Sequence, residues 1–103
     1  MLFRSSPFPA LVLSAPSRLG RGQTGELGFS FNGVSSAAVH VLHVDVVDPA
    51  GKTVAYYSGN LLASGGKAGK LLPLAMNDRT GNWTVRVKDI LTGQTQASTI
   101  EVF

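Results

Sequence analysis

The chain has 103 residues, a length typical of one domain, and its 44% hydrophobic and 15% charged content excludes wholesale disorder. It contains no cysteine, which excludes disulfide scaffolds, Cys-ligated zinc and iron–sulfur clusters, and no apolar stretch reaches the roughly 18 residues that a membrane span needs. The net charge of +3 comes from residues 1–25, which hold three Arg and no acid, while six basic and six acidic residues balance in the remainder. Nucleic-acid-binding domains concentrate Lys and Arg on one face, whereas the charges of this chain balance beyond residue 25. We therefore expect no nucleic-acid partner.

The first half of the chain predicts three strands. Residues 1–19 are expected to be a linker or an edge-strand lead, and the apolar run Ala10–Ser14 between two prolines predicts an edge strand within it. The second strand ends at Asn32-Gly33, and large apolar residues alternate along it with small or polar ones. Residues 39–48 form the longest and most β-branched run. The residues predicted to face inward on these two strands are Leu27, Phe29 and Phe31, followed by Leu42, Val44 and Val46.

A clear turn opens the second half of the chain. Asp48-Pro49-Ala50-Gly51 has type I turn chemistry, because Asp caps the first position, Pro presets φ at the second and Gly occupies the fourth. A returning strand is predicted at Thr53–Tyr57, a flexible connection at Ser64–Gly69 and a short strand at Lys70–Ala75. One-turn helices are conceivable only at Val34–Ala38 and Asn60–Ser64.

Two further strands complete the prediction. An Asp-led turn at 78–81 precedes a half-buried strand, and a hairpin around Gly93 leads into the last strand at Gln96–Phe103. The residues predicted to face inward here are Trp83, Val85, Val87, Ile100 and Val102. About seven short strands in a chain of this length predict an all-β fold, an immunoglobulin-like antiparallel β-sandwich, over residues 20–103.

The titratable residues give little support for catalysis. Asp48, Asp78 and Asp89 occupy turn positions, where a capping role is expected. His40 and His43 lie three residues apart on a strand, so they point to opposite faces and cannot chelate one metal. His43 and Asp45 share a face, but a third ligand is not evident. No hydrolase, phosphate-binding or zinc-protease motif occurs, so we expect no enzyme, no metal and no cofactor.

The adjacent aromatic residues Tyr56 and Tyr57 are the remaining candidates for ligand or partner contact. On a strand one of them must face outward while the other faces inward. An exposed Tyr can stack on a sugar ring or anchor a partner protein, and Asn60 would supply a polar group beside it. Trp83 begins a half-buried strand, so core burial is expected for it.

Two motifs carry a resemblance to a known group of domains. Residues 44–52 read V-x-V-x-D-P-x-G-K, and residues 81–93 read G-x-W-x-V-x-V-x-D-x-x-T-G. Together they resemble bacterial immunoglobulin-like and macroglobulin-like β-sandwich modules. Such modules sit at the ends of large secreted or periplasmic proteins, including β-galactosidase-like glycoside hydrolases. The resemblance implies an extracellular or periplasmic location and no catalytic residue.

The leading hypothesis is therefore a non-catalytic accessory domain in the C-terminal part of a larger exported bacterial protein. Its partner would be a neighbouring domain of the same polypeptide, contacted through the Ala10–Ser14 edge and a face formed by Val41 and Val47. The alternative is a carbohydrate- or cell-wall-binding module that uses Tyr56 or Tyr57 as an exposed platform.

Overall fold

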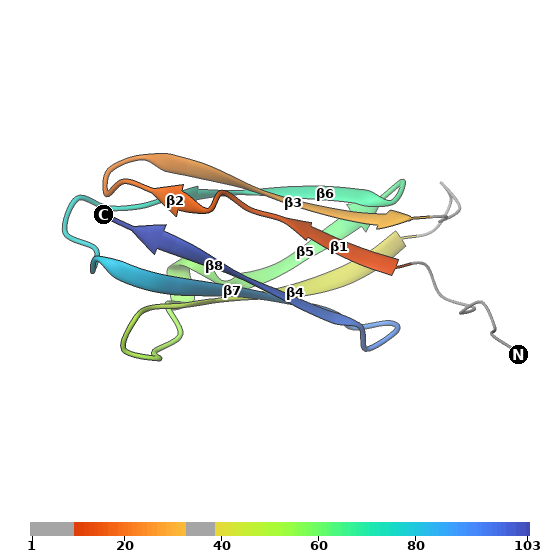
Figure 1. Cartoon of the computed structure of the whole chain (residues 1–103). Coiled ribbons are helices and arrows are strands. Elements are labelled where there is room, and N and C mark those ends of the chain that lie inside the picture. The colour runs from red at the N-terminus through yellow and green to blue at the C-terminus, as the bar shows by residue number, and fades with distance from the viewer. Residues whose placement is uncertain (1–9, 33–38) are drawn as a thin grey trace, which may run out of the picture.

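The computed structural model describes residues 10–32 and 39–103, and this part of the chain is all-β with one short 3₁₀ turn (Figure 1). The predicted helical turn at Val34–Ala38 lies outside the described residues. The elements in chain order are β1 (Ala10–Ser14), β2 (Arg18–Leu19), β3 (Thr24–Asn32), β4 (Val39–Val47), η1 (Ala55–Tyr57), β5 (Gly59–Ser64), β6 (Lys67–Pro73), β7 (Gly81–Asp89) and β8 (Thr95–Val102).

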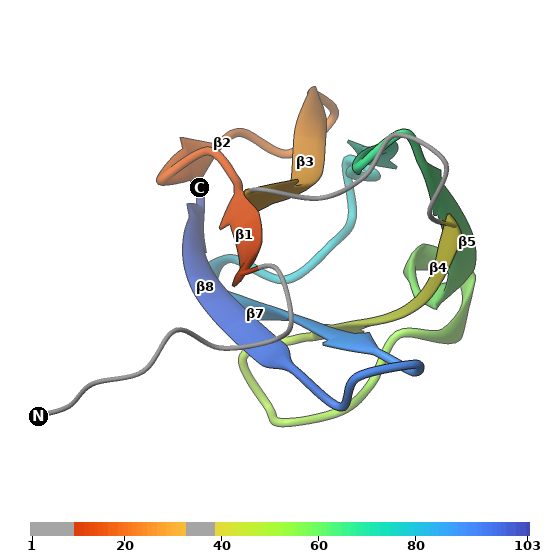
Figure 2. The ribbon, with the colours of Figure 1, turned by 90° about the vertical axis from the view of Figure 1, so that its right-hand side faces the viewer.

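The described strands form a single curled sheet. Its strand order is β1-β3-β6-β5-β4-β7-β8-β2, and every neighbouring pair is antiparallel except β2 and β8. Seen end-on, the sheet curls round the core, so that β3 faces β7 across it and β1 lies beside β8 (Figure 2). The predicted all-β, immunoglobulin-like class is confirmed, with eight described strands instead of about seven.

The segment from β1 to β2 passes from one layer of the curled sheet to the other. β1 pairs with β3, whereas β2 pairs with β8, where Ser17 O accepts a 2.9 Å hydrogen bond from Glu101 N. The amide of Leu11 also donates to Gln94 Oε1 at 3.0 Å, just before β8 begins. The part of residues 1–19 that the structure describes is thus integrated into the sheet; residues 1–9 lie outside the described residues.

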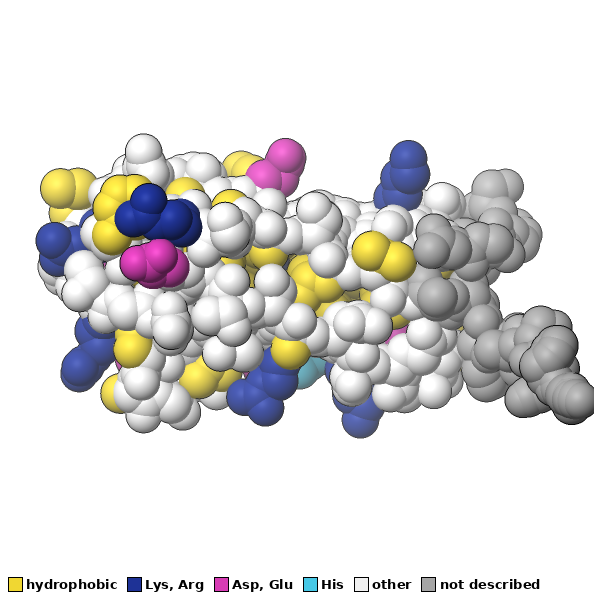
Figure 3. Space-filling view, in the orientation of Figure 1, with side chains coloured by type: hydrophobic (Ala, Val, Ile, Leu, Met, Phe, Trp, Pro, Cys, Tyr) yellow, Lys and Arg dark blue, Asp and Glu magenta, His cyan; other side chains and the backbone are white. Residues whose placement is uncertain are grey.

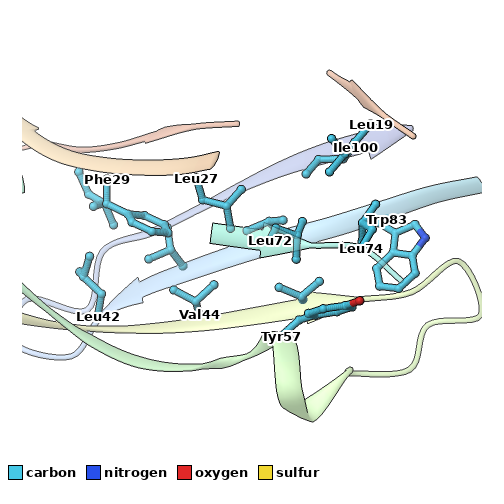
Figure 4. Close-up of a cluster of buried hydrophobic side chains, with 14 of the residues drawn as sticks. Leu19, Leu27, Phe29, Leu42, Val44, Tyr57, Leu72, Leu74, Trp83 and Ile100 are labelled. Atoms are coloured by element: carbon cyan, nitrogen blue, oxygen red, sulfur yellow. The ribbon is translucent and has the colours of Figure 1, made fainter. Parts of the chain in front are cut away.

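The predicted core faces are confirmed. Leu27, Phe29 and Phe31 are buried on β3, and Trp83, Val85 and Val87 are buried on β7. Figure 4 shows Phe29 and Leu42 toward one end of this cluster and Tyr57 and Trp83 toward the other. Each fully buried aliphatic or aromatic side chain contributes about 1.5–3 kcal/mol to folding, so this cluster is the main source of stability. The buried apolar residues of the remaining strands are Leu11, Leu19, Leu42, Val44, Val46, Ala63, Leu72, Ile100 and Val102.

The predicted strand at Thr53–Tyr57 is wrong. Thr53 makes only an isolated bridge to Val47, and the chain then enters η1. The reason is the Ser58 hydroxyl, which accepts from Val46 N at 2.9 Å and donates to Val54 O at 2.8 Å. A side chain therefore takes the place of a strand partner beside the end of β4, and the backbone is free to turn.

The prediction of a flexible connection at Ser64–Gly69 is also wrong. It is a two-residue hairpin turn at Gly65 and Gly66, which have φ values of +66° and +80°. Such paired positive values favour a tight hairpin and suit glycine. Residues 60–64, where a one-turn helix was an alternative, belong to strand β5. The strand predicted at Lys70–Ala75 is β6, which runs from Lys67 to Pro73.

Candidate functional site

The structure places Tyr57 inside the core and Tyr56 outside it. Tyr57 is 4% exposed, and its hydroxyl donates to Asp78 Oδ2 at 2.5 Å. The same hydroxyl accepts from Ala75 N at 3.1 Å. Burial and the hydrogen bond to Asp78 raise the pKa of Tyr57 well above its usual value. Tyr57 is therefore an anchor that ties η1 to the chain segment following β6.

Tyr56 is 73% exposed and lies against the Tyr57 ring, with ring centroids 4.5 Å apart and planes tilted by 57°. It borders a surface hollow of about 520 Å³ formed where the 48–53 turn, η1 and the 75–79 segment meet. Trp83 and Val54 contribute its apolar wall. The polar residues around it, together with Tyr56, are Asp48, Lys52, Thr53, Asn77, Asp78 and Arg79.

The two carboxylates beside this hollow are fixed by the backbone of their own turns. Asp48 Oδ1 accepts from Ala50 N at 2.9 Å and from Lys52 N at 3.0 Å, which confirms the predicted capped turn. Asp78 Oδ2 accepts from Ala75 N at 2.7 Å. The second turn therefore spans 75–78 and not 78–81, because Asp78 closes it through its side chain and through the bond from Asp78 N to Ala75 O.

The main-chain oxygen of Arg79 is held by the core. It accepts a 2.8 Å hydrogen bond from Trp83 Nε1, and Trp83 is 2% exposed. The Arg79 side chain extends outward, with Nε 3.8 Å from Asp48 Oδ2. The charged side chains around the hollow are two acidic ones, Asp48 and Asp78, and two basic ones, Lys52 and Arg79. Their formal charges cancel.

Asn60 does not line this hollow. It is exposed on β5, opposite His43 of β4, and its Oδ1 lies 2.7 Å from His43 Nδ1. His43 Nε2 lies 3.0 Å from Asp45 Oδ1. The hydrogen bond to Asn60 and the nearby charge of Asp45 raise the pKa of His43. Asn77, which does border the hollow, carried no distinguishing pattern in the sequence.

The two histidines point to opposite faces of β4, as predicted. His40 is buried and stacks on Phe31, with ring centroids 4.3 Å apart, whereas the His43 side chain is 43% exposed. His43 and Asp45 bond directly to each other. Within residues 10–32 and 39–103, no group of three His, Cys, Asp or Glu side chains is placed to hold a metal ion.

Asp89 is completely buried and bonds to His40 at 2.9 Å. It also accepts from Leu91 N at 3.1 Å and from the Thr92 hydroxyl at 2.7 Å. Burial alone would raise the pKa of this carboxyl, but the hydrogen bonds from Thr92, His40 and Leu91 outweigh burial and lower it. The expected turn role of Asp89 is confirmed, and its bond to His40 is an additional contact that no local sequence pattern indicates.

Only one of the two residues expected on a contact face is exposed. Val41 is 39% exposed, whereas Val47 is 7% exposed and packs beneath the loop whose Thr53 bridges to it. Val41 lies opposite Leu62 on β5, and its carbonyl accepts a hydrogen bond from Ile90 N. We call the exposed aliphatic group at this end of β4 the outer apolar patch; it comprises Val39, Val41, Leu62, Ile90 and Leu91.

Basic side chains do not gather into one surface on the face shown in Figure 3. Lys and Arg side chains are dispersed there along the molecule, with acidic side chains between them. This distribution differs from the concentrated basic face of nucleic-acid-binding domains. No helix in the described part of the chain has the length and apolarity needed to cross a membrane.

The architecture is similar to that of the CARDB domain of a Pyrococcus furiosus protein, which was crystallised in complex with di-metal ions. The TM-score is 0.58 and the sequence identity 12%, and the match covers 96% of this chain and 97% of that chain. Neither a family model nor a curated protein matches the sequence. The likeness at this identity defines the fold alone: the chain has an all-β, immunoglobulin-like fold of the CARDB type.

Proposed function

We propose that the chain is a non-catalytic accessory domain in the C-terminal part of a larger exported bacterial protein, where it docks on a neighbouring domain. The observation that carries this proposal is the outer apolar patch. Scattered exposed apolar residues are normal, whereas neighbouring ones on one surface mark a contact site. Within the patch, Leu62 is 65% and Leu91 72% exposed.

The position of the patch indicates which neighbour would cover it. Ala10 pairs with Asn32, and Val39 pairs with Ser64, so the start of β1 and the start of β4 lie at the same end of the sheet (Figure 1). A domain joined ahead of β1 would therefore lie beside the patch. We assign the patch to that preceding domain of the same polypeptide.

The non-catalytic role is supported by what the carboxylates do. Asp48, Asp78 and Asp89 each accept backbone amide hydrogen bonds that close turns. These groups stabilise the fold, which is the role expected of Asp at turns. The CARDB-type fold and the resemblance of residues 20–103 to modules of exported proteins, such as β-galactosidase-like glycoside hydrolases, agree with an accessory role.

The size and location of the native polypeptide test this proposal. An antibody raised against the chain is used to probe cytoplasmic and exported fractions of the source organism. We expect a band much larger than 10.8 kDa in the exported fraction. A band near 10.8 kDa, or a large band confined to the cytoplasm, would overturn the proposal.

A further inference from the structure

We propose that the hollow beside Tyr56 is a binding site for a neutral saccharide, with the Tyr56 ring stacked on a face of one sugar ring. This site goes beyond the docking role, because it shares no residue with the outer apolar patch. Its volume of about 520 Å³ lies within the roughly 300–1,000 Å³ of small-molecule sites.

Tyr56 is a rigid and accessible platform. The residue is 73% exposed, so burial in the core does not account for its position. The ring is backed by Tyr57 at 4.5 Å, and Tyr57 is held by its hydrogen bond to Asp78. A fixed aromatic ring presents a flat apolar surface with a negative face, which complements the C–H groups on one side of a pyranose.

The polar groups around the hollow suit hydroxyls better than charged groups. Asp48 and Asp78 supply acceptors, Lys52 and Arg79 supply donors, and Asn77 supplies both. A sugar hydroxyl both donates and accepts, so it can bond to either kind of group. Because the formal charges of these side chains cancel, the site offers no net attraction to a phosphate or another polyanion.

Asp48 and Arg79 show how a sugar hydroxyl could bond to an acceptor and a donor of the hollow at once. Arg79 Nε lies 3.8 Å from Asp48 Oδ2, which is longer than a hydrogen bond. The other Asp48 oxygen is occupied by the amides of Ala50 and Lys52, so the carboxylate is held in place. A hydroxyl placed beside this pair would donate to Asp48 Oδ2 and accept from the Arg79 guanidinium.

The hollow stays open when the patch is covered. The patch includes Val39 at the start of β4, whereas Asp48 of the hollow follows the end of β4. Nine residues of strand separate these ends by about 30 Å at the usual rise per residue. A neighbouring domain on the patch would therefore leave Tyr56 accessible, and the two proposals can fail independently.

The test is a titration of the isotopically labelled chain, followed by backbone amide NMR shifts. The probes are cellotriose, chitotriose and lactose as neutral saccharides, with 3′-sialyllactose and glucose 6-phosphate as charged comparisons. We expect at least one neutral probe to shift amides around the hollow, in the 48–56 and 75–79 segments, with a Kd between about 0.1 and 5 mM. No shift with any neutral probe, or tighter binding of a charged comparison, would overturn the proposal.

Three variants then locate the site. Tyr56→Ala is expected to weaken binding at least tenfold, and Tyr56→Phe, which keeps the ring, to change it less than threefold. The matched control is Leu71→Ala, which removes a side chain 62% exposed on β6, and it is expected to leave binding unchanged. The dispersion of amide shifts checks that each variant is folded. Equal binding by Tyr56→Ala and the parent chain would contradict the assignment.

Discussion

His40 Nδ1 donates a hydrogen bond to Asp89 Oδ2 over 2.9 Å, and this bond joins the start of β4 to the end of β7 inside the protein. The His40 and Asp89 side chains are 5% and 0% exposed. Asp89 also accepts from Leu91 N and the Thr92 hydroxyl, so one carboxylate organises both the β7–β8 turn and its contact with β4. Phe31 stacks on one face of the imidazole.

Replacing Asp89 by Ala is expected to lower the free energy of unfolding by about 3–5 kcal/mol. The loss is large because three donors, including the buried imidazole of His40, are left without their acceptor. Urea unfolding followed by tryptophan fluorescence measures it through Trp83. Asp45→Ala is the control, because the Asp45 side chain is 39% exposed, and it is expected to cost less than 1 kcal/mol. Equal losses in the two variants would contradict the structural role of Asp89.

The same carboxylate predicts a loss of stability in acid. Asp89 has a lower pKa in the folded chain than its ordinary value of 3.8, so folding favours its ionised form. Its contribution is fully present above about pH 4 and is lost as the pH falls through the folded pKa. We expect unfolding free energies measured from pH 6 to pH 2.5 to fall more steeply in the parent chain than in Asp89→Asn. Parallel curves would show that Asp89 does not contribute.

His43 is expected to titrate above its ordinary pKa of 6.5. The hydrogen bond to Asn60 and the charge of Asp45 stabilise the imidazolium, so its stabilising effect is present below pH 6.5 and is lost as the pH rises through the folded pKa. NMR titration of its Cε1 proton, assigned with a His43→Gln variant, measures this value. Asn60→Ala and Asp45→Asn should each lower it. A value at or below 6.5 in the parent chain would contradict the bonding described.

Tyr57→Phe is expected to lower the free energy of unfolding by about 1–3 kcal/mol. The substitution keeps the buried ring but removes the hydroxyl that bonds to Asp78 and Ala75. Thermal and urea unfolding measure the change. Tyr56→Phe is the matched control, and because Tyr56 is 73% exposed we expect its stability to stay within about 0.5 kcal/mol of the parent. A larger effect at Tyr56 than at Tyr57 would reverse the assignment of the inner and outer rings.

Leu62→Lys tests the outer apolar patch in the full native polypeptide. In the isolated chain we expect a change within about 0.5 kcal/mol, because Leu62 is 65% exposed. In the larger polypeptide the buried charge should loosen the contact and speed limited proteolysis of the segment ahead of β1 several-fold. Leu71→Lys, at a side chain 62% exposed outside the patch, should leave the cleavage rate unchanged. Equal rates for both variants and the parent would argue against a docked neighbour.

Alternating apolar residues were enough to predict β3, β4, β7 and β8, because each of these strands has one face in the core and one in water. Alternation did not predict the structure of β5 or η1, where other interactions define the backbone. In β5 two adjacent Leu side chains obscure the period, and only the hairpin with β6 and the pairing with β4 define the strand. At η1 the Ser58 hydroxyl replaces a strand partner.

The candidate sites likewise combine features that a local pattern predicts with features that depend on distant segments. Opposite faces for Tyr56 and Tyr57 were expected from a strand, but both residues lie in η1, where their rings are in contact. Tyr57 is the buried one, and its hydroxyl bonds to Asp78, 21 residues further along the chain. His40 and Asp89 are 49 residues apart, and no local pattern links them. Asn77 reaches the hollow only because the 75–78 turn lies beside η1. Contacts between distant segments decide these features, and a single sequence does not record them.

The passage of one segment from β1 to β2 also bears on how the domain avoids self-association. β1 and β2 are the two terminal strands of the sheet order, yet only residues 15–17 separate them in the chain. The outermost positions beside β3 and β8 are thus capped by strands of five and two residues, and short edge strands are poor templates for aggregation. Removal of residues 10–19 would uncover the long edges of β3 and β8 together, and intermolecular strand pairing would become the main hazard of truncation.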